Sequence, residues 1–538
     1  MAAAGITTAR LFPEWRWIEA EKGAWRWDDA DSLVKVAHEN SIEISGILFG
    51  SAPNAEAIHA FPMDSLGDWS NYVSTIVSRY KKQIRYWEVW NEGNAAFNDG
   101  RHGTSDYAKL AAASYAAAKK ANPQAQVGIS VASFDAPYIN QTIIAMANAG
   151  APNSFDYLCI HPYEIAAGIA NQVDGEIPFL WMSHLLRDIL KASAPERADA
   201  PIWITEVGRR TGVLDGHVVT EQDAAKTLAK IYTLSLAQGI ARIQWFEAQD
   251  PEGEDQGFGL LARDGRARDT YRTLQTLTTT LGGRPVYQGW LAVGRGGRGY
   301  GFVFEGATAA VLVAWMPKKQ TDASLSFASD VTVIDSLTGM STTLKANQTL
   351  VLTDTPILVV GLPSALREQA QRNAGENFPW GGDYRRSRTV SLQPGSLDAN
   401  NGVHLAGGEE RPAVKFADGS EGIVIQGDMA HPVNFYVHPS FATVQTKNYF
   451  IRIAIRRLTA GNLGMNLRYE VADSQGRAPY ANAGRWFGAS ADTGWQTYTW
   501  QVADAAFAKM WGYDFSIQPE HSVSFVLGKV EVSTGPFE

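Results

Sequence analysis

The sequence has a single cysteine, Cys159, among 538 residues. One cysteine excludes an intrachain disulfide framework, and its apolar neighbours indicate a buried, inert thiol. No run of about 18 apolar residues occurs, so no membrane-spanning helix is expected. The N-terminal stretch Met-Ala-Ala-Ala-Gly is too short and too uncharged for a secretory signal peptide, and the cellular location stays open.

Charge of either sign is also scarce. Charged residues make up 19% of the chain, and the formal net charge is −9 with both signs interspersed. This pattern suggests neither nucleic acid nor an anionic membrane as a partner. No glycine-rich phosphate loop follows a predicted strand, which disfavours a nucleotide-dependent enzyme. A neutral, polyhydroxylated ligand such as a carbohydrate fits better, and we expect neither a cofactor nor a metal ion.

Tryptophan, in contrast, is abundant, with 17 residues. Several fall on predicted loops and strand ends, where a flat ring can stack on the apolar face of a sugar. Core packing is the more common use of such a ring, so no single tryptophan identifies a site. The hydrophobic fraction of 45% is enough for sizeable cores, and the length predicts two to four domains.

Residues 6–282 alternate short apolar runs with helical segments, which is typical of a parallel sheet wrapped by helices. Helix ends are recognisable, because Asn122-Pro123 stops an alanine-rich helix and Thr220 with Asp223 resembles a capping box. We therefore predict a (β/α)8-type barrel, of class α/β, over residues 1–283. Its seven expected strands are residues 7–12, 43–49, 84–90, 126–132, 157–161, 202–205 and 241–246.

After residue 283 the sequence pattern changes to short segments in which apolar and polar residues alternate, as in β-strands. It predicts a small β-sandwich over residues 284–364, a polar linker over 365–384 and a second β-sandwich over 385–538. The second sandwich is either a carbohydrate-binding module or a stabilising or dimerising domain. The first interpretation rests on aromatic residues at predicted loops and strand ends, namely Tyr480, Trp486, Phe487, Trp495, Trp500 and Trp511.

Two glutamates stand where predicted strands end. Glu92 follows the strand in Tyr86-Trp-Glu-Val-Trp-Asn-Glu-Gly-Asn94, and Glu206 ends the strand in Pro201-Ile-Trp-Ile-Thr-Glu-Val-Gly208. Retaining glycoside hydrolysis needs two facing carboxylates about 5–5.5 Å apart, one to attack the anomeric carbon and one to protonate the leaving oxygen. Either glutamate alone is as well explained as a loop charge or an ion-pair partner. Two at matching strand ends favour catalysis.

These motifs resemble those of clan A glycoside hydrolases, which are retaining (β/α)8-barrel enzymes with glutamates at the ends of strands four and seven. Within the clan, the sequence is most similar to glycoside hydrolase family 39 and its relatives, including enzymes that cut bacterial exopolysaccharides. The resemblance implies a retaining O-glycoside hydrolase that acts on a β-linked oligo- or polysaccharide. It makes Glu92 the catalytic acid/base and Glu206 the nucleophile.

Five further residues match the clan. Arg10 would lie beside the nucleophile and keep it ionised, because a nearby opposite charge favours the charged form. Asn91 would hydrogen-bond the sugar 2-hydroxyl. His161 and Tyr163, in a His-Pro-Tyr motif, would line the site and contact the nucleophile. Trp245 would be the platform under the sugar next to the cleaved bond.

Other charged residues near these motifs have simpler interpretations. Glu88 lies at even spacing from Glu92 and should point inward, so we expect a buried structural partner of Arg10. The acidic loop at 250–255 is expected to be solvated rather than a calcium site. Three loop residues beside the catalytic strands either bind an acidic group of the substrate or are surface charges: His102, Arg209 and Arg210.

The sequence departs from the clan at two places. The strand that normally precedes Ala4-Gly-Ile-Thr7 is absent, and Phe49-Gly-Ser-Ala52 stands where the clan usually has a histidine. Either the chain is truncated at its start, or something else fills the gap between the second and eighth strands of the clan. We expect a partner chain, as in a homo-oligomer, or a rearranged segment to cover the gap. The alternative function is a non-catalytic carbohydrate-binding protein on a degenerate barrel.

Overall fold

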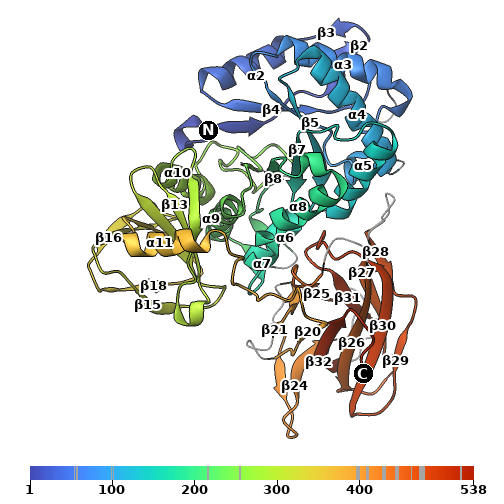
Figure 1. The fold of residues 1–538 in the computed structure, drawn as a ribbon, viewed down its shortest axis with the longest axis vertical. Helices are drawn as coiled ribbons and strands as arrows, with labels where there is room; N and C mark the ends of the chain where they lie inside the picture. The colour runs from blue at the N-terminus through green and yellow to red at the C-terminus, as the bar shows by residue number, and fades with distance from the viewer. Residues whose placement is uncertain are drawn as a thin grey trace.

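The molecule has a barrel, a small β-sandwich at its side (green to yellow) and a larger β-sandwich below it (orange to red), as Figure 1 shows. The computed structural model describes residues 1–53, 55, 59–98, 100, 102–214, 217–253, 256–395, 400–407, 411–426, 432–442, 447–461, 463–471, 479–520 and 524–538.

The barrel contains one parallel sheet in the order β1-β4-β5-β6-β7-β8-β11. Each of the seven predicted segments forms one of its strands, because near-continuous apolar runs suit strands buried on both faces. Cys159 in β7 is buried as expected. The strands are β1 (Thr8–Arg10), β4 (Glu43–Leu48), β5 (Tyr86–Val89), β6 (Gln126–Ala132), β7 (Tyr157–His161), β8 (Ile202–Val207) and β11 (Arg242–Trp245).

Helices cover the outer face of this sheet (Figure 1). The predicted capping box is present, since the Thr220 hydroxyl accepts the Asp223 N–H and the Asp223 carboxylate accepts the Thr220 N–H. Among the helices described, none combines the length and apolar character needed to cross a bilayer. The helices are α1 (Trp15–Ile18), α2 (Asp28–Glu39), α3 (Leu66–Arg79), α4 (Thr104–Ala121), α5 (Ala136–Asn148), α6 (Tyr163–Asn171), α7 (Glu176–Leu180), α8 (Met182–Ser193), α9 (Glu221–Ala237) and α10 (Asp269–Leu281).

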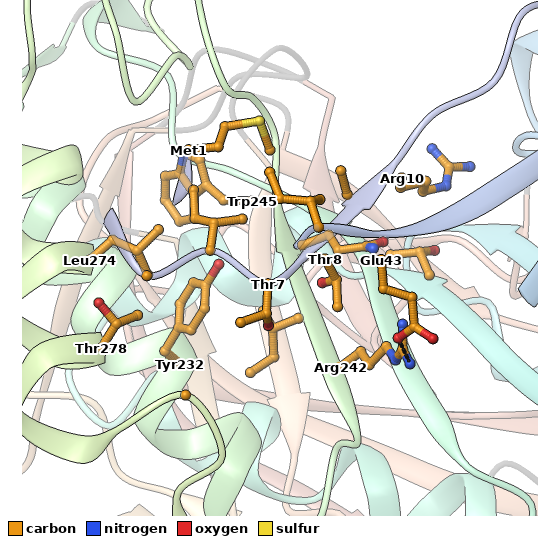
Figure 2. A pocket seen from close by; sticks show the side chains of 18 of the residues that line it. Met1, Thr7, Thr8, Arg10, Glu43, Tyr232, Arg242, Trp245, Leu274 and Thr278 are labelled. Carbon is orange, nitrogen blue, oxygen red and sulfur yellow. Dashed lines mark hydrogen bonds and ion pairs between the residues drawn. The ribbon is translucent and has the colours of Figure 1, made fainter. Parts of the chain in front are cut away.

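The barrel is open between its first and last strands, as predicted. Among the described residues no ladder joins β1 to β11, and the chain start forms a 3-10 turn (Ala2–Ala4) against α10 rather than an eighth strand. Side chains span the opening instead, where Arg242 of β11 pairs with Glu43 of β4. A cavity of about 1670 Å³ follows the gap, and Figure 2 shows Thr7, Thr8 and Arg242 among its lining residues.

The small β-sandwich shares its core with the barrel. Trp315 and Tyr300 lie in the same apolar cluster as Leu228 of α9. The buried Glu176 carboxylate of α7 accepts hydrogen bonds from Lys230 at 2.8 Å and from the Trp315 indole at 3.0 Å. The strands are β12 (Val286–Trp290), β13 (Tyr300–Glu305), β14 (Ala310–Trp315), β15 (Asp322–Ser326), β16 (Val331–Asp335), β17 (Ser341–Leu344), β18 (Thr349–Leu352) and β19 (Ile357–Val360).

Residues 365–384 connect the two sandwiches, as a linker would, but they are packed rather than loose. Helix α11 (Ser364–Asn373) lies on β12, where a Cβ on Gly289 would be only 1.7 Å from the Ala370 carbonyl oxygen. Only glycine allows so close a contact. Further on, Trp380 is buried against the small sandwich at Tyr300.

The larger β-sandwich has two antiparallel sheets around a core of its own. Trp500 and Phe487 lie in this core and so cannot stack on a sugar, whereas Trp486 is 42% and Trp511 37% exposed. The strands are β20 (Thr389–Leu392), β21 (Asn400–Asn401), β22 (Val403–Ala406), β23 (Ala413–Lys415), β24 (Glu421–Gln426), β25 (Val433–Val437), β26 (Lys447–Arg457), β27 (Leu463–Glu470), β28 (Tyr480–Asn482), β29 (Phe487–Ala489), β30 (Trp495–Ala505), β31 (Phe515–Pro519) and β32 (Ser524–Ser533).

Candidate active site

The two predicted catalytic glutamates meet at the carboxyl ends of the barrel strands. Glu92 follows β5, Glu206 lies near the end of β8, and His161 ends β7 between them. One carboxylate oxygen of each glutamate and one ring nitrogen of His161 lie within 4.8 Å of one another. Retaining glycosidases hold their two carboxyl groups about 5–5.5 Å apart, so this geometry matches theirs.

The backbone that presents Glu92 has an unusual conformation. Trp90 and Glu92 have φ angles of 65° and 50°, a left-handed region that residues other than glycine rarely occupy. Such strain persists only where neighbouring contacts fix it. The buried Trp90 provides them, because its N–H donates to the Leu48 carbonyl at 2.8 Å and its indole N–H to the Phe97 carbonyl at 2.7 Å.

Arg10 connects the supporting residues to the nucleophile candidate. Its Nε and Nη2 donate to the two carboxylate oxygens of Glu88 at 3.0 and 2.8 Å, and its Nη1 donates to Glu206 Oε2 at 3.0 Å. Nη2 also donates to Asn91 Oδ1 at 2.7 Å, which fixes the orientation of the Asn91 side chain. The prediction that Glu88 is the buried structural partner of Arg10 is confirmed.

Charge, rather than burial, decides the state of Glu88. Burial opposes its ionisation, but the positive charge of Arg10 and hydrogen bonds from His161 and Arg10 hold the pKa of its carboxyl well below the usual range. Glu88 is therefore an anion in the barrel interior, and it balances the guanidinium charge. A bidentate pair of this kind fixes the guanidinium plane, and with it the position of the Nη1 that reaches Glu206.

His161 contacts a different glutamate from the one expected. The sequence predicted that His161 and Tyr163 both touch the nucleophile. The Tyr163 hydroxyl does donate to Glu206 Oε1 at 2.8 Å, but His161 Nδ1 lies 2.8 Å from Glu92 Oε1 and 3.9 Å from Glu206 Oε2. The clan resemblance places both residues in the site, but it does not settle which carboxylate each one bonds.

The environment of His161 favours its protonated form. Burial by itself lowers the pKa of the imidazole, but the negative charge of Glu206 and hydrogen bonds to Glu88 and Glu92 raise it to about 9. Its Nε2 lies 3.1 Å from the Thr205 hydroxyl. Thr205 is a site residue that the motifs do not predict, and its signal in the sequence is a polar side chain directly before Glu206 in a strand that is apolar elsewhere.

Trp245 lies at the end of β11 as predicted. It is 9% exposed, and its indole N–H donates to the Phe258 carbonyl at 3.0 Å, which fixes the ring. Figure 2 shows Trp245 and Arg10 lining the same cavity, which also reaches Glu206. The indole is thus a fixed, buried ring at the edge of the cavity that reaches Glu206.

The charged loop residues bond with their own surroundings. His102 Nδ1 lies 2.9 Å from Asp106, Arg209 Nη2 donates to Asn171 at 3.0 Å, and Arg210 Nε donates to the Gln256 carbonyl at 3.1 Å.

In the acidic loop, Asp250 Oδ1 accepts the N–H groups of Gly257 and Gly259, and Oδ2 pairs with Arg268. Residues 254 and 255 lie outside the described part of the chain. The carboxylate of Asp250 thus has partners within its own loop, in keeping with a structural role for this residue.

Glu92, His161 and Glu206 are also a donor set that a metal ion could use. Their donor atoms already have partners, since Arg10 and Tyr163 each hold one oxygen of Glu206 and His161 holds Oε1 of Glu92. A cation would have to displace these donors and lie beside the Arg10 guanidinium. The arrangement suits proton transfer and nucleophilic attack better.

Known proteins resemble the chain in both sequence and fold. Residues 6–142 match the model of glycosyl hydrolase family 10. Endo-1,4-beta-xylanase 3 of Hypocrea jecorina is 32% identical over 158 residues, which cover 28% of this chain and 42% of the xylanase. A beta-xylosidase of Caldicellulosiruptor saccharolyticus is 25% identical over 276 residues, covering 47% of this chain and 56% of the xylosidase. The chain thus spans about half the length of these curated relatives.

Among solved structures, a family 39 glycoside hydrolase from the gut symbiont Bacteroides cellulosilyticus WH2 superposes with a TM-score of 0.54 at 21% identity. The match covers 67% of this chain and 76% of that enzyme, and it shows a shared fold. The predicted resemblance to clan A glycoside hydrolases, family 39 among them, is therefore confirmed, and the chain shares its fold with the family 39 enzyme.

Proposed function

We propose that the protein is a retaining O-glycoside hydrolase that cleaves a β-linked oligo- or polysaccharide by double displacement. The observation that carries the proposal is the pair of carboxylates at the barrel mouth, with oxygens of Glu92 and Glu206 within 4.8 Å. An inverting enzyme needs roughly 6.5–9.5 Å between its carboxyl groups to admit a water molecule. The names of the two curated relatives make β-xylosides and xylan the first substrates to test.

In the first step, a carboxylate oxygen of Glu206 attacks the anomeric carbon and forms a glycosyl ester. The bond to the leaving oxygen breaks, and that oxygen takes the proton of Glu92. Arg10 and Tyr163 hold both oxygens of Glu206, so the nucleophile is aligned before the substrate arrives. Asn91, which Arg10 orients, would donate to the sugar 2-hydroxyl, a contact that strengthens in the transition state.

In the second step, water attacks the anomeric carbon while Glu92 takes its proton. The glycosyl ester breaks, and the Glu206 carboxylate is regenerated with net retention of configuration. His161 bonds Oε1 of Glu92, which makes Oε2 the oxygen that exchanges protons with the leaving group and with water. His161 is thus a positioning residue for the acid/base.

The competing hypothesis is a carbohydrate-binding protein without turnover. Binding alone does not require two facing carboxylates together with Arg10 and Tyr163 on one of them, so the geometry favours catalysis.

The test is incubation with a panel of aryl β-glycosides and polysaccharides, followed by labelling with a 2-deoxy-2-fluoroglycoside of the preferred sugar. We expect turnover and a covalent adduct on the peptide that contains Glu206, and no adduct in Glu206→Gln. Sugar binding without turnover or adduct would favour the competing hypothesis.

We also propose that a second copy of the chain covers the gap between β1 and β11 in solution. The open edges of two parallel strands present backbone groups that would otherwise face water or an unrelated chain. Light scattering during size-exclusion chromatography would measure the molar mass. A monomer at all accessible concentrations would contradict this proposal and leave the glycosidase proposal unaffected.

A further inference from the structure

The larger β-sandwich contacts the barrel beside the active site. Its segment 508–514, called the Trp511 turn below, lies against the start of α6, and Figure 1 shows the sandwich next to α6 and α7. Ala508 is fully buried in the apolar cluster of the barrel, not in the core of its own sandwich. A Cβ on Gly512 would lie 3.2 Å from the backbone oxygen of Glu164, so the turn directly abuts that residue.

Glu164 places this contact on the acid/base side of the site. It follows Tyr163, whose hydroxyl bonds the nucleophile candidate, and its carboxyl interacts with Ser133 and with the charge of Glu92. The residue that protonates the leaving oxygen lies next to the departing part of the substrate. The Trp511 turn therefore contacts a residue whose carboxyl lies within electrostatic reach of the acid/base candidate.

Two buried carboxylates hold the turn in one conformation. Glu470 accepts the backbone N–H groups of Ala508 and Lys509 at 2.7 Å each and of Met510 at 3.2 Å. Asp514 pairs with Lys509 Nζ at 3.1 Å. Buried polar groups specify geometry where each one is hydrogen-bonded. The turn is thus rigid where it reaches the barrel.

The turn presents one exposed ring. Trp511 is 37% exposed and stacks on Tyr480, with ring centres 4.9 Å apart and planes at 28°. The Arg468 guanidinium lies 5.4 Å from one ring centre and 5.5 Å from the other. The guanidinium thus contacts the stacked pair, and more than a third of the Trp511 surface stays exposed. A stacked, partly exposed indole offers apolar surface on which a sugar ring can pack.

We propose that Trp511 binds the sugar ring on the leaving-group side of the scissile bond, so that the larger sandwich completes the active site. The ligand is a β-linked pyranosyl unit whose apolar face stacks on the indole. This inference rests on the proposed function. A remote binding module would act only on long or insoluble glycans, whereas Trp511 in this place affects the cleavage of short, soluble ones.

The test compares two substrates of the same sugar. A soluble β-linked oligosaccharide fills the leaving-group side, whereas a glycosyl fluoride leaves it empty. We expect Trp511→Ala to lower kcat/KM about tenfold on the oligosaccharide and less than about twofold on the fluoride, since one stacking contact is lost. Trp511→Phe keeps an aromatic face and should recover most of the loss. The control is Trp486→Ala, because Trp486 is equally exposed on the same sandwich but packs on Gly464.

A second measurement isolates the binding of the leaving-group sugar. The 2-fluoroglycosyl enzyme, trapped on Glu206, is reactivated slowly by water and faster by an acceptor sugar that enters from the leaving-group side. Trp511→Ala should raise the acceptor concentration for half-maximal reactivation about tenfold and leave the rate in water unchanged.

The outcomes separate the two proposals. If the wild-type chain cleaves neither substrate, the proposed function falls and the role of Trp511 falls with it. If the wild type cleaves both and Trp511→Ala affects both equally or neither, the Trp511 platform is overturned while the proposed function stands. Retained activity on the fluoride shows that the variant is folded.

Discussion

His161 Nδ1 lies 2.8 Å from Oε1 of Glu92, and the opposite nitrogen of the same ring faces the buried Glu88 at 3.7 Å. The imidazole therefore connects the acid/base candidate to an anion that Arg10 neutralises in turn. Arg10, Glu88 and the protonated His161 alternate in sign along a row that ends at the Glu92 carboxyl. A substitution at either end of this row should therefore change the electrostatic environment of the other residues in the site.

The stability of the protein should fall as His161 loses its proton. Its folded-state pKa of about 9 lies above the ordinary value of 6.5, so its stabilising contribution is complete below pH 6.5 and is lost as pH rises through about 9. The difference corresponds to roughly 3 kcal/mol. Urea unfolding at several pH values measures this contribution to the free energy of unfolding. His161→Gln should lack this component, and an equal loss of stability between pH 6.5 and 9 in both proteins would contradict the assignment.

Arg10→Met should destabilise the fold as well as abolish activity. It leaves the Glu88 carboxylate buried without its bidentate partner, which typically costs about 3–5 kcal/mol. The double variant Arg10→Met with Glu88→Gln should recover part of the free energy of unfolding, because the unpaired charge is gone. Lys22→Met is the control, since its pair with Asp68 is exposed and contributes about 1 kcal/mol or less. An equal effect of the two single variants would argue against a buried charge.

Tyr163→Phe should slow turnover without unfolding the protein. The hydroxyl donates to Glu206 Oε1, and a hydrogen bond to a charged group contributes about 1.5–3 kcal/mol, so kcat should fall roughly tenfold to a hundredfold. Tyr115→Phe removes a hydroxyl that accepts from Arg197 on the outside of the barrel, and it should leave kcat unchanged. Wild-type kcat in Tyr163→Phe would show that this contact does not act in the transition state.

The roles of the two glutamates can be separated by rescue with azide. Glu92→Ala should lose about a thousandfold on an oligosaccharide and much less on a glycosyl fluoride, because fluoride departs without an acid. Azide should then give the β-glycosyl azide. In Glu206→Ala, azide replaces the nucleophile and should give the α-glycosyl azide from a β-glycosyl substrate. The opposite pairing of products would show that the assigned roles are reversed.

The sequence predicts the barrel well because its strands are buried on both faces. The segment 157–161 is apolar almost throughout and coincides with β7 (Tyr157–His161), and the capping box at Thr220 is a local signal for the start of α9. The open side of the sheet was also predictable, because the sequence contains seven such apolar segments where a closed barrel of this type has eight. The packing of residues 365–384 could not be predicted from the sequence. Their polar, glycine-rich composition does not indicate that Trp380 is buried against a strand distant in the chain.

Within the site, strand ends determine which residues come together but not how they bond. Both His161 and Tyr163 reach the mouth of the barrel as the motif predicts. The partner of each depends on side-chain positions across several strands, and here His161 turns to Glu92 and away from Glu206. Trp511 lies far from this motif in the chain, and only the docking of the larger sandwich on α6 brings its turn against Glu164.

The shared core has a consequence for cooperativity. Trp315 and Trp380 belong to the same apolar cluster as Leu228 of the barrel, so the barrel, the small sandwich and the segment between the sandwiches should melt together. The larger sandwich has a separate core and is the part that could melt independently. In calorimetry, the first 380 residues or so would then behave as one folding unit. In recombination between genes, the same boundary separates a part that must be inherited whole from a part that can be exchanged.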